Sequence, residues 1–220
     1  MKNYKGYALL SIFSTAVALA ITFMLKAAVG VGAFDAATQS LSLLSGIRIG
    51  TIAMILNLSF VLGQFIILKK DFGFTRFLQI PLSILIGILV NFFYYDLFGF
   101  VAISNYAIAM LIYVLALVLA SFSVSMVMTL DLVTFPIESF CLTLTKKVPL
   151  KFAVIRQIAD ILFIAVSLSL TFMFGLTPAV REGTVIGMLI FSPMMGFFIS
   201  KVHPVLSKNG IIEKEACRQQ

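Results

Sequence analysis

Long runs without charge constrain this chain more than any other sequence feature. No acidic or basic side chain occurs within residues 7–25 or within residues 97–130. A helix crosses the hydrocarbon core of a bilayer in about 20 residues, so either run is long enough to span it. Only 11% of all residues are charged, against about a quarter in soluble proteins. The sequence therefore predicts an all-α, polytopic membrane helix bundle with no soluble domain.

The apolar runs predict six transmembrane helices. They cover residues 7–25, 49–68, 77–95, 106–128, 151–175 and 183–200. In this arrangement Lys26, Arg48 and Arg181 lie on one side of the membrane, and every other lysine or arginine outside the spans lies on the opposite side. Because basic residues accumulate in short cytoplasmic loops, both termini are predicted to be cytoplasmic.

Two polar segments interrupt the apolar pattern, and each predicts a helix too short to cross the bilayer. They are residues 26–48 and residues 131–149. In the first, Asp35 lies where the N-cap of the helix is expected. In the second, Thr134 and Pro136 suit the N-cap region and the first turn, where Glu138 would favour the helix dipole. Each short helix either lies at the membrane interface or re-enters the membrane.

The same order of elements occurs twice. Residues 1–100 and residues 101–200 each follow the order span, short helix, span, span, and residues 201–220 form a polar cytoplasmic tail. Aligning the two halves places Phe34 on Phe135. Because each half has an odd number of spans, the second repeat must enter the membrane inverted. Inverted repeats with broken helices in matching positions are typical of secondary transporters, which bind their substrate between the repeats.

Beyond Lys151 at its first position, the fifth predicted span contains two charged residues, Arg156 and Asp160. Asp160 lies near the bilayer centre, where a lone carboxylate is costly. Arg156 precedes it by four residues and therefore lies on the same face of the helix. One interpretation is functional: Arg156 binds an anionic substrate group, or Asp160 carries a coupling proton. The other is a structural ion pair that holds this helix in the bundle.

Other polar residues in the short helices and spans are further candidates for substrate binding or coupling. They are Glu138, Asp35, Thr134, Asn57, Asn91 and Gln39. The alternative role of Asp35 and Glu138 is structural: an acid in the first turn stabilises the start of a helix. Asn57 and Asn91 either line a cavity or hydrogen-bond neighbouring helices to each other.

The chain has no motif for catalysis or for a cofactor. It contains no Walker loop, HExxH, GxSxG or GxGxxG pattern, and its single histidine, His203, has no expected partner. Cys141 and Cys217 lack the paired spacing of a disulfide or metal site. Basic loops of a membrane protein explain the net charge of +7 better than nucleic-acid binding does. We therefore expect no enzyme activity, no cofactor, no metal and no nucleic acid.

Four short motifs are spread along most of the chain. They are Gly30-x-Gly32-x-Phe34-Asp35, then Ile49-Gly50-Thr51, then Arg156 with Asp160, and finally Gly183-Thr184 followed by Pro193. In these motifs the chain resembles the YczE/YyaS/YitT family of bacterial integral membrane proteins, with Ala33, Phe34 and Asp160 where that family often has Pro, Trp and Glu. The resemblance implies a multi-pass protein of the bacterial inner membrane, and it implies no particular substrate.

Together these features predict a secondary transporter or permease for a small polar or anionic solute, working by alternating access between the inverted repeats. Its partners would be the lipid bilayer and the solute, as a monomer or as a homodimer through a GxxxG face. Two alternatives stay open. One is a substrate-binding subunit of an energy-coupling vitamin transporter, whose docking motif resembles Ala16 and Ala20. The other is a membrane accessory protein that transports nothing.

Overall fold

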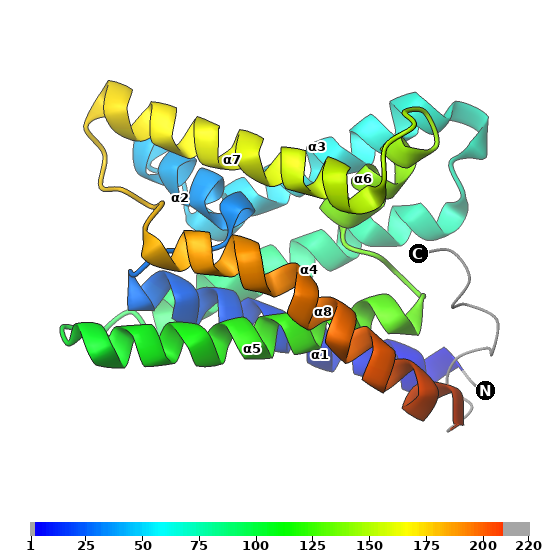
Figure 1. Cartoon of the computed structure of the whole chain (residues 1–220), viewed down its shortest axis with the longest axis horizontal. Helices are drawn as coiled ribbons and strands as arrows, with labels where there is room; N and C mark the ends of the chain where they lie inside the picture. The colour runs from blue at the N-terminus through cyan, green and yellow to red at the C-terminus, as the bar shows by residue number, and fades with distance from the viewer. Residues whose placement is uncertain (1–2, 209–220) are drawn as a thin grey trace.

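The computed structural model describes residues 3–208, and these residues form helices joined by loops, with no β-strand among them (Figure 1). The α-helices are α1 (Asn3–Ala27), α2 (Ala33–Ser45), α3 (Ile49–Leu68), α4 (Gln79–Asn91), α5 (Tyr106–Leu130), α6 (Pro136–Thr145), α7 (Phe152–Phe174) and α8 (Glu182–Lys208). Two 3₁₀ helices, η1 (Lys69–Asp71) and η2 (Phe74–Leu78), precede α4, and a π-helical segment, η3 (Phe92–Leu97), follows it.

Six helical segments are long and apolar enough to cross a membrane, which confirms the predicted polytopic helix bundle. Five of them are based on α1, α3, α5, α7 and α8, and the remaining one, Phe74–Leu97, runs continuously from η2 through α4 to η3. The span boundaries agree with the predictions to within a few residues, except at the end of α8. That helix continues to Lys208, so the first part of the predicted tail is helical, and residues 209–220 lie outside the described residues.

The short helix α2 begins before the position that the sequence suggested. Its N-cap is Gly32, with φ −56° and ψ 154°, and the Gly32 carbonyl accepts the first helical hydrogen bond from the N–H of Ala36 at 2.8 Å. The prediction that Asp35 is the N-cap is therefore wrong, because Asp35 is already the third residue of the helix. At the other end, Gly46 adopts the left-handed conformation with φ 71° that commonly terminates a helix.

The short helix α6 starts in the same way. Phe135, rather than Thr134, is its N-cap residue, because the Phe135 carbonyl accepts the first helical hydrogen bond, from the N–H of Ser139 at 2.9 Å. Pro136 occupies the first turn as predicted, where its missing N–H has no helical acceptor in any case. Glu138 is consequently the third residue of α6, the position that Asp35 holds in α2.

The helices form two layers (Figure 1). In the first layer α1 packs against α5 and α4, and α5 packs against α8. In the second layer α2 packs against α7 and α3, and α6 packs against α3 and α7. Each half of the sequence gives two helices to each layer, so the halves are interleaved. The interface of α3 with α4 is the main link between the layers, whereas α7 and α8 make no comparable interface over residues 3–208.

The link between the layers depends on two glycines that let the backbones of α3 and α4 approach closely. A Cβ atom on Gly50 would lie 2.2 Å from the carbonyl oxygen of Gly87. Beside this crossing, the Asn91 Oδ1 accepts the N–H of Gly50 at 2.9 Å, and its Nδ2 donates to the Thr51 Oγ1 at 3.0 Å. Asn91 therefore joins α4 to α3, one of the two roles that the sequence left open for it.

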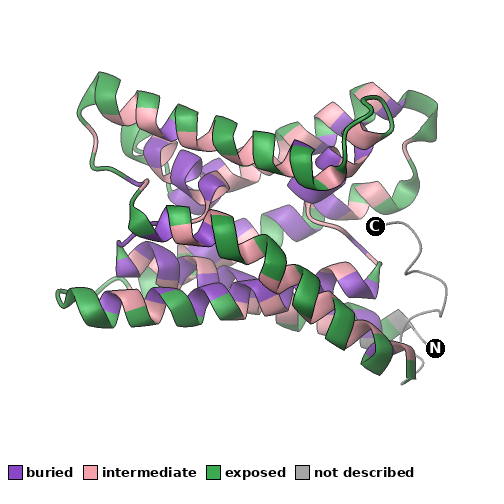
Figure 2. Cartoon of the chain, viewed as in Figure 1, coloured by how far each residue is buried: buried purple, intermediate pink, exposed green. Residues whose placement is uncertain are grey.

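The outward faces of the later spans are exposed (Figure 2), and many of the exposed side chains there are large and apolar. On α7, for example, Ile158, Ile161 and Leu162 are exposed. Buried residues instead gather between the layers and along the contacts of α1 with α5. Large exposed apolar surfaces mark contact with a membrane or a partner, and here they belong to helices that are long and apolar enough to cross a membrane.

Candidate functional site

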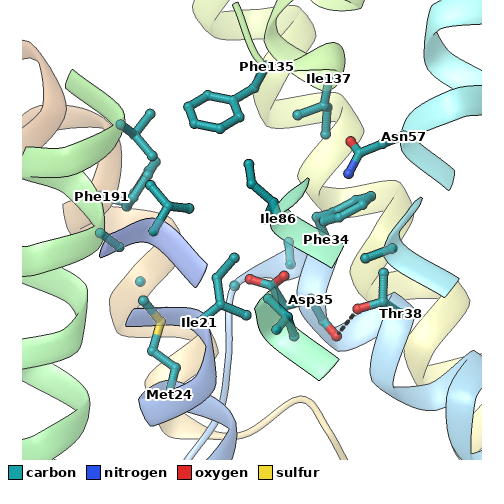
Figure 3. Close-up of a pocket in the computed structure, with 18 of the residues that line it drawn as sticks. Ile21, Met24, Phe34, Asp35, Thr38, Asn57, Ile86, Phe135, Ile137 and Phe191 are labelled. Carbon is teal, nitrogen blue, oxygen red and sulfur yellow. Dashed lines mark hydrogen bonds between the residues drawn. The ribbon is translucent and has the colours of Figure 1, made fainter. Parts of the chain in front are cut away.

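A cavity of about 170 Å³ lies between the two layers, and all eight α-helices contribute residues to its lining (Figure 3). We call it the central pocket. An engineered protein cavity of about 150 Å³ binds benzene, so the central pocket is large enough for a small molecule. Most of its lining is apolar. Its polar side chains are Asp35, Thr38, Asn57, Ser83, Glu138, Arg156, Asp160 and Ser192.

Arg156 lies between two acids in the wall of the central pocket. It forms a hydrogen-bonded ion pair with Asp160, four residues later on α7, as the spacing predicts. Its Nε also lies 3.7 Å from the Oε1 of Glu138 on α6. The side chains of Arg156, Glu138 and Asp160 are only 17%, 8% and 15% exposed, respectively. One guanidinium therefore faces two carboxylates that different helices supply.

The contact with Arg156 involves only one of the two carboxylate oxygens of Glu138. Its second carboxylate oxygen, Oε2, is buried and has no hydrogen-bond partner among the described residues. A buried polar oxygen without a partner is costly, and such atoms are rare in folded proteins. The Oε2 of Glu138, a residue of the pocket lining, is therefore an atom at which a proton or another hydrogen-bond donor would be stabilised.

Asp35 reaches the central pocket from the first turn of α2. Figure 3 shows its carboxylate among the residues that line the cavity, which include Ile21, Phe34 and Ile86. The Asp35 carboxylate makes no ion pair and no hydrogen bond with the described residues. The backbone carbonyl of Asp35 accepts a hydrogen bond from the hydroxyl of Thr38 at 2.8 Å. Asp35 is thus an acid in the pocket without a counter-charge in contact.

The structure brings five of the predicted site residues into the central pocket. They are Arg156, Asp160, Glu138, Asp35 and Asn57.

The other three predicted site residues, Thr134, Gln39 and Asn91, do not line the pocket. Thr134 lies in the loop before α6, where the next residue, Phe135, lines the cavity instead. On α2 it is Thr38, three residues after Asp35, that faces the pocket rather than Gln39.

Aromatic side chains close much of the remaining surface of the pocket. Phe34 lines the cavity and packs edge-on against Phe163 of α7, with ring centroids 5.4 Å apart. Phe135 and Phe191 line it from other sides, as Figure 3 shows. The charged groups therefore lie in a mainly apolar cavity, where electrostatic contacts are stronger than in water.

A second buried polar cluster, which the sequence analysis did not predict, holds α6 in place. The Nη1 of Arg76 donates to the Gln64 Oε1 at 2.9 Å, to the Thr143 Oγ1 at 3.0 Å and to the Ser139 Oγ at 3.3 Å. Gln64 also donates to the backbone carbonyl of Pro136 at 3.1 Å. From its position between two apolar runs, Arg76 is expected only to be one of the basic residues of the cytoplasmic loops. Ser139 and Thr143 of α6 are four residues apart, so the sequence could have predicted that they form a polar face on this helix.

The central pocket offers acids, a cation and aromatic surface, but no arrangement for a metal ion. Among the described residues no group of three histidine, cysteine, aspartate or glutamate side chains is placed to hold one. Chemically, the pocket can pair with a charged or polar group of a small molecule and can exchange protons at its carboxylates.

Comparison with known proteins identifies a family and no characterised relative. No curated protein and no solved structure gives a match to the chain. A family model described as "Family of unknown function (DUF6198)" matches residues 4–200, a range that contains every residue of the central pocket. The chain belongs to this family.

Proposed function

We propose that the protein is a secondary transporter that carries a small polar solute through the central pocket. The observation that carries this proposal is the pocket itself: a cavity between two helix layers, lined by all eight α-helices and by the first turns of both short helices. Binding sites of secondary transporters lie between structural repeats, where helices are broken. An accessory protein without transport has no need of such a cavity.

The layers suggest how the pocket would open to either side. Each layer contains one pair of helices from each half of the chain, which fits two repeats that enter the membrane in opposite orientations. Rocking of the layers about the close contact of Gly50 with Gly87 would expose the pocket first to one side and then to the other. The moving units in this proposal are therefore the layers, rather than the two halves of the sequence.

The proposed location is the inner membrane of a bacterium, with both termini in the cytoplasm. Most loop lysines and arginines then lie on the cytoplasmic side, as the positive-inside rule requires. The resemblance to the YczE/YyaS/YitT family agrees with this location. Three carboxylates face the pocket against one guanidinium that is already paired, so a polar solute fits the charge balance better than an anionic one.

The direct test combines binding and flux. The purified protein is screened by thermal shift with small amines, amino acids, neutral polar solutes and small carboxylates, and the uptake of each solute that stabilises it is measured in proteoliposomes. We expect at least one solute to raise the melting temperature and to cross the bilayer. Solutes that stabilise the protein but never cross, or a panel without any effect, would contradict the proposal.

A matched pair of variants shows whether flux uses the central pocket. Asp35→Asn removes a charge in the pocket, whereas Asp71→Asn removes the same charge from an exposed position in η1. We expect the first variant to lose most of the flux and the second to keep it. Equal flux in both variants would place the pathway elsewhere.

A further inference from the structure

We infer that the central pocket takes a small organic cation whose positive group lies between Asp35 and Glu138 and whose apolar body contacts the aromatic lining. This inference rests on the proposed function and specifies its substrate class.

The charge balance of the pocket is the first argument. Asp35, Glu138 and Asp160 supply three carboxylates, and Arg156 is the one basic residue in the described lining. Its guanidinium already contacts two of these acids, so its positive charge is offset before an anionic solute arrives. A cationic ligand would offset the excess of acid, whereas an anion would add to it.

The unpartnered carboxylate oxygens provide a second argument, which is independent of the number of acids. The Oε2 of Glu138 belongs to a side chain that is only 8% exposed, lines the cavity and has no hydrogen-bond partner in residues 3–208. Asp35 also lacks a side-chain partner there. An ammonium group has several N–H donors and no acceptor, so it is the kind of group that these carboxylates lack as a partner.

The apolar lining of the pocket determines which kind of body the ligand can have beside its charged group. Phe34, Phe135 and Phe191 lie around the cavity together with Ile21, Met24 and Ile86 (Figure 3). Aromatic faces attract cations, and the apolar side chains favour a ligand with a hydrocarbon body. A volume of about 170 Å³ limits that body to roughly one ring, by comparison with the engineered cavity of about 150 Å³ that binds benzene. An inorganic cation would leave this surface unused.

Three probes of nearly equal size separate charge from shape: benzylamine as the cation, benzyl alcohol as the neutral analogue and benzoate as the anion. Binding to the purified full chain is measured by calorimetry, with sodium chloride as the inorganic control. We expect benzylamine to bind about tenfold or more tightly than the other two probes, because a charged hydrogen bond is stronger than a neutral one. Benzoate or benzyl alcohol binding as well as benzylamine would overturn the inference, as would sodium competing with it at equal concentration.

Binding measurements on two variants test whether the cation lies at Asp35. Asp35→Asn should weaken benzylamine binding about tenfold or more and should leave benzyl alcohol unaffected, whereas Asp71→Asn should change neither. Unchanged benzylamine binding in Asp35→Asn would overturn the placement. If Asp35→Asn does not fold, the ranking of the three probes on the unmodified chain still decides the ligand class.

Flux separates this inference from the proposed function. Benzylamine that binds through Asp35 but does not cross proteoliposomes would contradict transport and leave the cation site in place. Flux of a neutral or anionic solute that benzylamine does not inhibit would support transport and contradict the cation site.

Discussion

The two short helices, α2 and α6, hold corresponding places in the two halves of the chain, yet they are anchored by different forces. Each begins without a side-chain cap, carries an acid as its third residue and lines the central pocket with its first turn. The acid of α6, Glu138, faces the guanidinium of Arg156. Ser139 and Thr143 of α6 accept hydrogen bonds from Arg76, which stabilises the position of the helix.

Helix α2 has no charged anchor in the described structure. It is held by small buried residues such as Ala36, by the packing of Phe34 on Phe163 and by a hydrogen bond of 2.7 Å between the hydroxyls of Ser40 and Ser167. Its acid, Asp35, therefore remains available to the pocket. One acid is therefore paired with a cation of the protein itself, whereas the other has no such partner among the described residues and stays available to a ligand or a proton.

The largest expected effect is the loss of the cation that anchors α6. Arg156→Met leaves Glu138 and Asp160 buried without a counter-charge, so the free energy of unfolding should fall by about 3–5 kcal/mol. Arg48→Met, which breaks the exposed pair with Asp96, should cost about 0–1 kcal/mol. Unfolding in detergent measures both.

A triple variant separates charge from packing at this site. Adding Glu138→Gln and Asp160→Asn to Arg156→Met removes the unpaired charges, and most of the lost stability should return. If the triple variant is as unstable as Arg156→Met alone, lost packing rather than buried charge explains the defect, and the contrast between α6 and α2 weakens.

The next effect concerns the cluster on the far side of α6. Arg76→Met removes three hydrogen bonds from a guanidinium to Gln64, Ser139 and Thr143, and the free energy of unfolding should fall by about 2–3 kcal/mol. Lys70→Met, at an exposed position in η1, is the control. Equal melting temperatures for the two variants would show that α6 does not depend on this anchor.

A smaller effect is expected for the uncharged anchor of α2. A double-mutant cycle of Ser40→Ala and Ser167→Ala should give a coupling energy of about 0.6 kcal/mol, typical of polar contacts between membrane helices. Ser59→Ala, at an exposed position, should show no coupling with Ser167→Ala. A coupling as large as the Arg76→Met effect would mean that both short helices are anchored equally strongly.

The smallest effect on stability is expected at Asp35. Because its carboxylate has no partner in residues 3–208, Asp35→Asn should leave the melting temperature unchanged or raise it slightly. Glu138→Gln removes an ion-pair partner of Arg156 and should lower it. A drop in Asp35→Asn as large as that in Glu138→Gln would show that Asp35 is structural after all.

Much of the fold could be predicted because it depends on local properties of the chain. The six spans follow from the length of the apolar runs, and the start of α6 follows from Pro136. The pair of Arg156 and Asp160 follows from helical spacing alone. Residues a few positions apart meet in any helix, whatever surrounds it.

Local sequence patterns therefore suffice to predict a polytopic helix bundle with two short helices, each bearing an acid near its start. The packing of distant helices brings Glu138 against Arg156 and half-buries Arg76 beneath α6, and it leaves Asp35 in the pocket without a partner among the described residues. It also interleaves the two halves into layers. The physical reason is that these contacts join residues far apart in the chain, and their partners depend on how apolar helices pack, which hydrophobic periodicity does not encode.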